Sequence, residues 1–223
     1  MSRLDPLLRQ SLFVAGTDTG VGKTWVTTRL LRAWVREGCR AAGMKPVAAG
    51  AERAAGGLRN EDALALQAAG NVALPYEVLN PCCLARPTSP HLAAQETGVS
   101  ISCDTIKSNF DRIVSLSDLV AVEGAGGWWA PIGEPGHAGE RGPTMEDVAR
   151  ALGLPVLLVV GVRLGSLNHA LLTAAAIRGC GLRLAAWVAN PIDPGFEDCA
   201  AYVESLQRRL PAPRVSVADD EVC

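Results

Sequence analysis

A glycine-rich segment near the N-terminus carries the clearest chemical signal. Residues 16–24 read Gly-Thr-Asp-Thr-Gly-Val-Gly-Lys-Thr and follow the largely apolar run 11–15. Glycines let successive backbone N–H groups turn toward one centre, and a helix that begins there adds its N-terminal partial positive charge. Lys23 can then reach the terminal phosphates of a nucleoside triphosphate, and Thr24 can offer its hydroxyl to Mg²⁺. The residues expected at the nucleotide are Gly20, Val21, Gly22, Lys23 and Thr24.

The simpler alternative is a glycine-rich turn before an unrelated helix. It is disfavoured because Gly-Lys-Thr follows an apolar strand and opens a helix-compatible stretch, 25–37, that ends at Gly38. The usual spacing has its first glycine at position 17, whereas this chain has Thr17 and supplies Gly16 instead. The sequence therefore predicts a phosphate-binding loop of a variant type.

Three charged residues stand where further site chemistry is expected. Glu123 ends an apolar run and precedes three glycines in four residues, which places a carboxylate where it can hold Mg²⁺. Asp62 is either a second oxygen ligand or the N-cap of the helix that follows it, and both interpretations stay open. Lys45 lies among small apolar residues, where a charge is costly unless it is used; the alternative is a side chain that snorkels to solvent.

Histidine and serine give no comparable signal. His91, His137 and His169 show no metal-ligand spacing and are interpreted as structural. The sequence contains no nucleophile elbow and no evident serine–histidine pairing. We therefore predict phosphoryl transfer rather than covalent hydrolysis.

The composition favours one domain, residues 1–223, because a chain of this length with 48% hydrophobic residues can bury a sizeable core. A net charge of −2 argues against nucleic acid or an anionic membrane as a partner. Seven cysteines, an odd number with no C-x-x-C pair, fit reduced thiols. No signal peptide or membrane span is evident, so a cytoplasmic location is expected.

Short apolar runs alternate with helix-like segments along the chain. Strands are predicted at 12–15, 41–47, 119–123, 156–162 and 184–189, and helices at 23–37, 62–69, 104–116, 145–152, 167–178 and 197–210. The pattern predicts an α/β fold with a doubly wound, mostly parallel sheet and helices on both faces. Ligands of such sheets bind at the carboxyl ends of the strands. The Gly- and Pro-rich stretch 131–143 is expected to be a surface loop, either a lid or inert.

Several motifs together resemble one family. They are 16–24, 45–48 (Lys-Pro-Val-Ala), 58–63 (Leu-Arg-Asn-Glu-Asp-Ala), 87–91 (Pro-Thr-Ser-Pro-His), 122–128 (Val-Glu-Gly-Ala-Gly-Gly-Trp), 161–170 (Gly-Val-Arg-Leu-Gly-Ser-Leu-Asn-His-Ala) and 188–190 (Val-Ala-Asn). In their order, they are similar to those of dethiobiotin synthetase, a family with a P-loop NTPase-like fold. Many enzymes share the phosphate loop, whereas the combination of Glu-Gly-Ala-Gly-Gly-Trp with Leu-Asn-His-Ala is specific.

The resemblance implies an ATP- and Mg²⁺-dependent ligase that closes 7,8-diaminopelargonic acid and CO₂ into dethiobiotin. It implies a carbamate that attacks the γ-phosphate, and a second amine that displaces phosphate from the mixed anhydride. By resemblance, Lys23, Lys45 and Thr19 are catalytic, and Thr24, Asp62 and Glu123 hold the metal. Asn190 contacts adenine, and the substrate contacts are Thr19, Lys45, Gly124, Gly126, Asn168 and Tyr202. The last two residues belong to the partner subunit's site in that family, which implies a homodimer.

The chain departs from the family pattern at three places. Ala49 stands where the family commonly has Ser, residues 134–143 form a longer stretch than usual, and residues 214–220 replace a loop that flanks the purine. Two other classes of protein are alternatives. A partitioning ATPase carries a signature lysine where this chain has Asp18. A synthetase acting on corrinoid carboxylates normally carries a glutamine-hydrolysing domain, for which this chain has no room, although a separate subunit could supply it.

Overall fold

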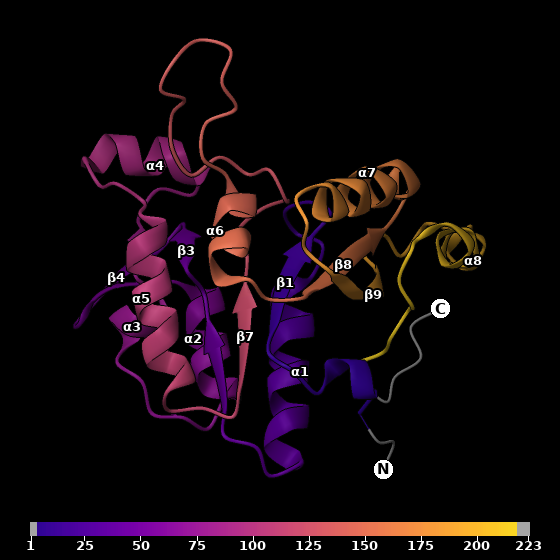
Figure 1. The fold of residues 1–223 in the computed structure, drawn as a ribbon, viewed down its shortest axis with the longest axis horizontal. Helices are drawn as coiled ribbons and strands as arrows, with labels where there is room; N and C mark the ends of the chain where they lie inside the picture. Colours follow the sequence, from indigo (N-terminus) through magenta and orange to yellow (C-terminus); the bar gives the residue numbers. More distant parts are fainter. Residues whose placement is uncertain (1–3, 218–223) are drawn as a thin grey trace.

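The computed structural model describes residues 4–217, and its centre is a sheet of five parallel strands (Figure 1). The strand order is β2-β7-β1-β8-β9. The strands are β1 (Leu12–Gly16), β2 (Ala41–Met44), β7 (Leu119–Glu123), β8 (Val156–Val162) and β9 (Leu184–Pro191). Their apolar runs are continuous because helices cover both faces of the sheet.

Alternate residues of the central strand face opposite layers. Leu12 and Val14 of β1 pack in the cluster that contains α1, whereas Phe13 and Ala15 pack in the cluster formed with α5, α6 and α7. The helices are α1 (Lys23–Arg36), α2 (Glu61–Ala69), α3 (Tyr76–Leu79), α4 (Pro90–Thr97), α5 (Cys103–Val114), α6 (Met145–Leu152), α7 (Ser166–Gly179) and α8 (Cys199–Arg209), with a 3-10 turn, η1, at Pro6–Leu8. The predicted doubly wound architecture is confirmed.

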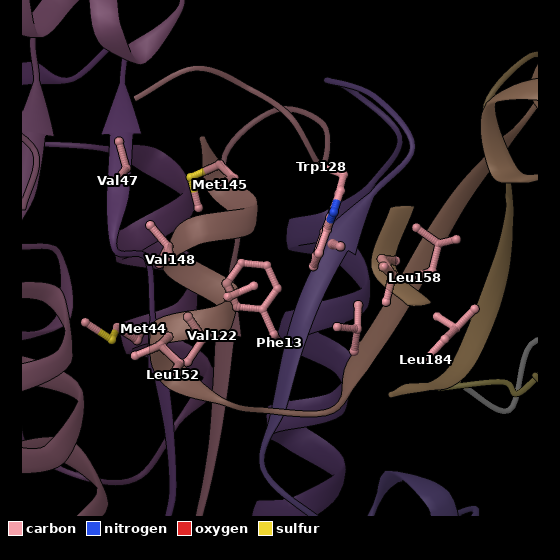
Figure 2. Packing of buried hydrophobic residues seen from close by; sticks show 14 of the residues in the cluster. Phe13, Met44, Val47, Val122, Trp128, Met145, Val148, Leu152, Leu158 and Leu184 are labelled. Atoms are coloured by element: carbon pink, nitrogen blue, oxygen red, sulfur yellow. The ribbon is translucent and has the colours of Figure 1, made fainter. Parts of the chain in front are cut away.

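An aromatic contact joins the core to the glycine-rich segment after β7. Figure 2 shows Phe13 between the side chains of α6 and Trp128. The two rings meet edge to face, with centroids 6.2 Å apart and an interplanar angle of 90°. Such pairs add about 0.5–1.5 kcal/mol beyond the area that they bury. The contact between Phe13 and Trp128 therefore fixes the segment 124–128 against the sheet.

The predicted strand 41–47 is wrong at its end. It divides into β2 and β3 (Val47–Ala49), because Pro46 has no N–H for a ladder. β3 pairs with β6 (Cys82–Leu84) in a separate parallel sheet, and β4 (Glu52–Ala54) pairs with β5 (Gly57–Arg59) in a hairpin. Lys45 thus lies at the point where the chain leaves the main sheet.

Two further sequence expectations concern the surface and the thiols. None of the helices in the described range is long and apolar enough to cross a membrane. The thiols of Cys39, Cys82, Cys83, Cys103 and Cys180 are free, as predicted. The prediction of a reduced thiol is wrong for Cys199, which is disulfide-bonded. Cys223 lies outside the described residues.

Candidate active site

The predicted phosphate loop connects β1 to α1. Gly20 and Gly22 adopt positive φ values of 73° and 89°, a conformation that L side chains rarely adopt. A Cβ added at Gly16 would lie 2.8 Å from Cγ2 of Val21 and 2.9 Å from Cδ of Lys23. The loop closes tightly over its first residue, which explains why this variant needs glycine at position 16.

Lys23 folds back across the loop. Its Nζ donates to the carbonyl oxygen of Asp18 at 2.9 Å. The carboxylate of Asp18 in turn accepts from Nη2 of Arg163 at 2.9 Å, and Arg163 is the residue that follows β8. Burial, and then the charge of Lys45, lower the pKa of Lys23 to about 8. The charges of Glu123, Asp62 and Asp18 raise this pKa but do not compensate, so an anionic ligand in the loop would offset the lowering by adding further opposite charge.

The three metal candidates and Lys45 form one cluster at the carboxyl ends of β7 and β2. The hydroxyl of Thr24 lies 2.8 Å from Oδ1 of Asp62 and 2.9 Å from Oε1 of Glu123. Nζ of Lys45 donates to Oδ2 of Asp62 at 2.9 Å and to Oε1 of Glu123 at 2.5 Å. Residues separated by up to 99 positions in sequence are thus brought within hydrogen-bond distance.

This geometry decides between the interpretations of Asp62 and Lys45. The N-cap of α2 is Asn60, whose side chain accepts from the amide of Ala63, so Asp62 is not the cap. Lys45 is only 4% exposed, which excludes the snorkelling alternative. Burial alone lowers the pKa of Lys45, but the charges of Glu123 and Asp62 outweigh it and raise that pKa. Burial raises the pKa of Asp62, yet Lys45 brings the net shift below the ordinary value.

The cluster also fits a magnesium ion. Glu123 is fully buried, and its Oε2 has no hydrogen-bond partner among the described residues. No group of three or more His, Cys, Asp or Glu side chains arranged for a metal occurs between residues 4 and 217. Mg²⁺ needs no such cage, because it commonly uses one or two carboxylates together with phosphate oxygens and water. Two carboxylates and a hydroxyl at a phosphate loop match that donor set.

A cleft of about 730 Å³ opens beside the cluster. Its walls come from the phosphate loop, β2–β3, the start of α2, the segment 87–90 before α4, and the glycine-rich segment after β7. The lining residues include Thr19, Gly20, Gly22, Lys23, Thr24, Lys45, Ala49, Asn60, Asp62, Thr88, Ser89, Glu123 and Gly126. Most of the residues predicted for phosphate, metal and amine chemistry thus share one cavity; Val21 and Gly124 are not among its lining residues.

One pairing at this cleft was missed from the sequence. Ser89 lines the cleft, and its Oγ lies 2.9 Å from Nδ1 of His91. The prediction that no serine–histidine pairing exists is therefore wrong. The two residues are separated by one proline in a Ser-Pro-His sequence, and the turn into α4 brings their side chains together. The available signal would have been Pro90, which favours the first position of a helix and would have predicted a helix start between the serine and the histidine.

The glycines after β7 differ in their placement. Gly126 lines the cleft with a φ of 62°, and a Cβ added there would lie 3.6 Å from the hydroxyl oxygen of Thr19. Gly124 lies beneath the cleft: its amide donates to the carbonyl oxygen of Val14. No contact in the described structure supports a direct role for Gly124, so that role stays a prediction.

The remaining predicted contacts lie outside this cleft. Asn190 on β9 donates from Nδ2 to the carbonyl oxygen of Val21 at 2.8 Å, so it holds the phosphate loop from behind. Asn168 is exposed in the first turn of α7, and Tyr202 is half-buried on α8, where its ring meets Phe196 edge to face. Neither Asn168 nor Tyr202 is among the residues that line the cleft of its own chain.

A buried polar network beneath the cleft holds the segments that carry Lys45 and Asp62. The hydroxyl of Tyr76 accepts from the amide of Asn60 at 2.8 Å and donates to Oδ1 of Asn80 at 3.0 Å. Nδ2 of Asn80 donates in turn to the carbonyl oxygen of Lys45 at 2.6 Å. Burial raises the pKa of Tyr76 to about 12, so the phenol keeps its proton.

Comparison with known proteins identifies the family. A family model described as an AAA domain matches residues 10–217. Among solved structures of similar fold, the MinC:MinD complex of Aquifex aeolicus has a TM-score of 0.52 at 15% identity, covering 92% of this chain and 79% of that one. The signal recognition particle 54 kDa protein of Aeropyrum pernix, in complex with GDP, has a TM-score of 0.50 at 15% identity, covering 95% of this chain and 42% of that one. These likenesses confirm the predicted P-loop NTPase-like fold and say nothing more.

Curated relatives are far more similar in sequence. The ATP-dependent dethiobiotin synthetase of Xanthomonas oryzae pv. oryzae (strain PXO99A) is 48% identical over 205 residues, which cover 91% of this chain and 88% of that protein. The synthetase of Aromatoleum aromaticum is 49% identical over 92% of this chain and 88% of its own length. That of Pseudomonas aeruginosa (strain UCBPP-PA14) is 48% identical over 91% and 86%. The chain therefore belongs to the family of ATP-dependent dethiobiotin synthetases.

Proposed function

We propose that the chain closes 7,8-diaminopelargonic acid and CO₂ into the cyclic urea dethiobiotin at the expense of ATP. One observation carries the proposal: Lys45, almost fully buried, bridges Asp62 and Glu123 in the cleft that Lys23 and Thr24 also line. A buried ammonium is costly unless a partner uses it. Here the two carboxylates hold the ammonium in place, and it can also meet an anionic substrate group beside the phosphate loop, as a reaction between carbamate and phosphate requires.

The reaction order follows from charge. One substrate amine captures CO₂ as a carbamate, whose oxygen attacks the γ-phosphate; the second amine then displaces phosphate from the mixed anhydride. Two anions must approach, so Lys23 and Lys45 would neutralise their repulsion and the charge that develops during transfer. Thr19 lies at the mouth of the loop, beside Gly126, and would orient the carbamate.

Thr24, Asp62 and Glu123 would hold Mg²⁺. When bound, the ion would offset the negative charge of the phosphates. The unpaired Oε2 of Glu123 and the partly exposed carboxylate of Asp62 are the groups that support this assignment. By its family resemblance, Asn190 would contact the base; its Nδ2 donates to the carbonyl oxygen of Val21 in the phosphate loop.

We further propose a cytoplasmic homodimer with shared sites. Asn168 and Tyr202 do not line the cleft of their own chain, which supports the prediction that they contact the substrate bound to the partner subunit. Asn168 lies in the first turn of α7, where free backbone N–H groups favour an anion such as the substrate carboxylate. An isologous pair would then complete two equivalent sites.

The activity is tested by supplying the diamine, bicarbonate and ATP and detecting the product by mass spectrometry. The ureido product should appear in a one-to-one ratio with ADP. ATP hydrolysis without that product would contradict the proposal.

The shared site is tested with mixed subunits. A Lys23→Ala subunit and a subunit carrying Asn168→Ala and Tyr202→Phe should each be nearly inactive, and hybrids should recover activity because one site is intact. Hybrids without recovery, or a fully active monomer, would contradict the shared site while leaving the reaction assignment in place.

A further inference from the structure

Ser89 and His91 form a pair that the phosphoryl-transfer residues leave unexplained. Ser89 is the residue before α4, yet its side chain makes no capping hydrogen bond in the described structure. Serine at this position usually accepts from an amide of the first helical turn. Its Oγ instead lies 2.9 Å from Nδ1 of His91, while the same serine lines the cleft. The hydroxyl of Ser89 therefore contacts the His91 imidazole in place of a helix-capping hydrogen bond.

The loop 131–143 supplies a carboxylate on the far side of the ring. Nε2 of His91 lies 3.9 Å from Oε1 of Glu134, and Figure 1 shows this loop rising beside α4. A carboxylate near Nε2 favours the tautomer that carries its proton there. Nδ1 is then free to accept, so the Ser89 hydroxyl donates a hydrogen bond to His91. The lone pairs of its oxygen are left to accept from other groups.

The other ionisable groups of the cleft are already committed. Its charged lining residues are Lys23, Lys45, Asp62 and Glu123. Both carboxylates contact Lys45 and Thr24, and Lys45 is the cation that they hold. Lys23 would serve the phosphates under the proposed function. Ring closure nevertheless releases a proton from an amine. His91, reached through Ser89, is the titratable group at this cleft that no phosphate or metal role engages.

We propose that Ser89 and His91 accept the proton of the second amine during ring closure, an inference that rests on the proposed function. The amine nitrogen forms a bond to the carbonyl carbon of the mixed anhydride, and the carbon–oxygen bond to phosphate breaks, so phosphate leaves with that electron pair. The amine proton passes to Oγ of Ser89 as the hydroxyl proton passes to Nδ1 of His91. The imidazolium beside Glu134 later returns its extra proton to solvent.

The proposal predicts a selective defect. In His91→Gln, the side chain can still contact Ser89 but cannot take a proton, so phosphoryl transfer should continue while ring closure slows by about 10²-fold, the lower end for general base catalysis. More ADP should then form per dethiobiotin as the stalled anhydride hydrolyses. Ser89→Ala should show the same change, and the double variant no further loss, because the two act as a unit.

The test measures ADP and dethiobiotin together in single turnovers of the full chain. His137→Gln is the matched control: this histidine belongs to the loop that carries Glu134, and its side chain is 87% exposed, so its ADP-to-product ratio should stay at the wild-type value. An equal fall of both products in His91→Gln would overturn the relay and assign the pair to binding. A wild-type chain that yields no dethiobiotin would instead refute the proposed function itself, so the two failures are distinguishable.

Discussion

Tyr76→Phe tests whether the buried network beneath the cleft sets the geometry of Lys45 and Asp62. The change removes one oxygen and leaves two buried groups without partners, the amide of Asn60 and Oδ1 of Asn80. Each such group costs about 1–3 kcal/mol. With partial relaxation, we expect the free energy of unfolding to fall by about 3 kcal/mol, or roughly 6–12 °C in Tm for a domain of this size.

The functional effect should be specific to the metal side of the site. Asn60 caps the helix that carries Asp62, and Asn80 holds the carbonyl of Lys45, so both metal-side groups lose support. Calorimetry with a non-hydrolysable ATP analogue should show weaker binding in Mg²⁺ but unchanged binding in EDTA, because the phosphate loop lies outside this network.

Ser11→Ala is the matched control. It removes a hydroxyl that accepts from the amide of Val120 at 2.9 Å, at the opposite end of the sheet. It should lower stability by about 1–2 kcal/mol without altering the Mg²⁺ dependence. A Tyr76→Phe protein that is destabilised yet keeps wild-type Mg²⁺-dependent binding would refute the reasoning, since the network would then support the fold alone.

Three further outcomes are expected. Lys23→Met should abolish turnover yet raise the Tm of the nucleotide-free protein at pH 7, because the pKa of Lys23 in the folded protein, about 8, lies below the ordinary 10.5. The stability of the wild-type protein therefore rises as the pH increases from about 8 to 10.5. Thermal unfolding at pH 10 should then show a smaller increase in Tm for the variant over wild type. Asp62→Ala should raise the Mg²⁺ concentration for half-maximal rate by about tenfold or more, a loss seen even for indirect metal partners, and an unchanged requirement would remove Asp62 from the metal site. In initial-rate assays, CTP should replace ATP better than GTP does. Asn190 commits its NH₂ to Val21 and leaves an oxygen that can accept from the 6-amino group of adenine or the 4-amino group of cytosine, where guanine has a carbonyl oxygen. Equal use of GTP would contradict this orientation.

The main strands were predictable because they are buried on both faces. β8 and β9 are apolar at nearly every position, so period and length alone indicated central parallel strands. The short elements were not. β6 has three residues and pairs only with β3, and α4 begins within a Pro-Thr-Ser-Pro sequence that was not predicted to be helical. Pro90 at its first helical position was a usable signal.

The residues of the site likewise include some that were predictable from the sequence and others that were not. The phosphate loop is a local motif, and Glu123 ends a strand that was itself predicted, so both were predictable. The partners of Tyr76 were not, because Asn60 and Asn80 reach it only once α2 and α3 have packed. Ala49 illustrates a departure with a visible setting: it lies in the same cleft as Ser89, so a hydroxyl is present on that wall although position 49 supplies none.

The cluster at Lys45 is better explained by chemistry than by stability. Removing two charges from water costs several kcal/mol each, and a buried ion pair repays this only if every lone pair is satisfied. Glu123 fails that condition, since its Oε2 has no partner in the described chain, while Lys23 carries a pKa lowered to about 8. Both are unfavourable, and in opposite senses: one carboxylate oxygen lacks a hydrogen-bond partner, and one ammonium is buried beside a second ammonium, that of Lys45. A nucleotide with its metal would relieve both conditions at once, so the polar interior of this cleft is arranged for what it binds.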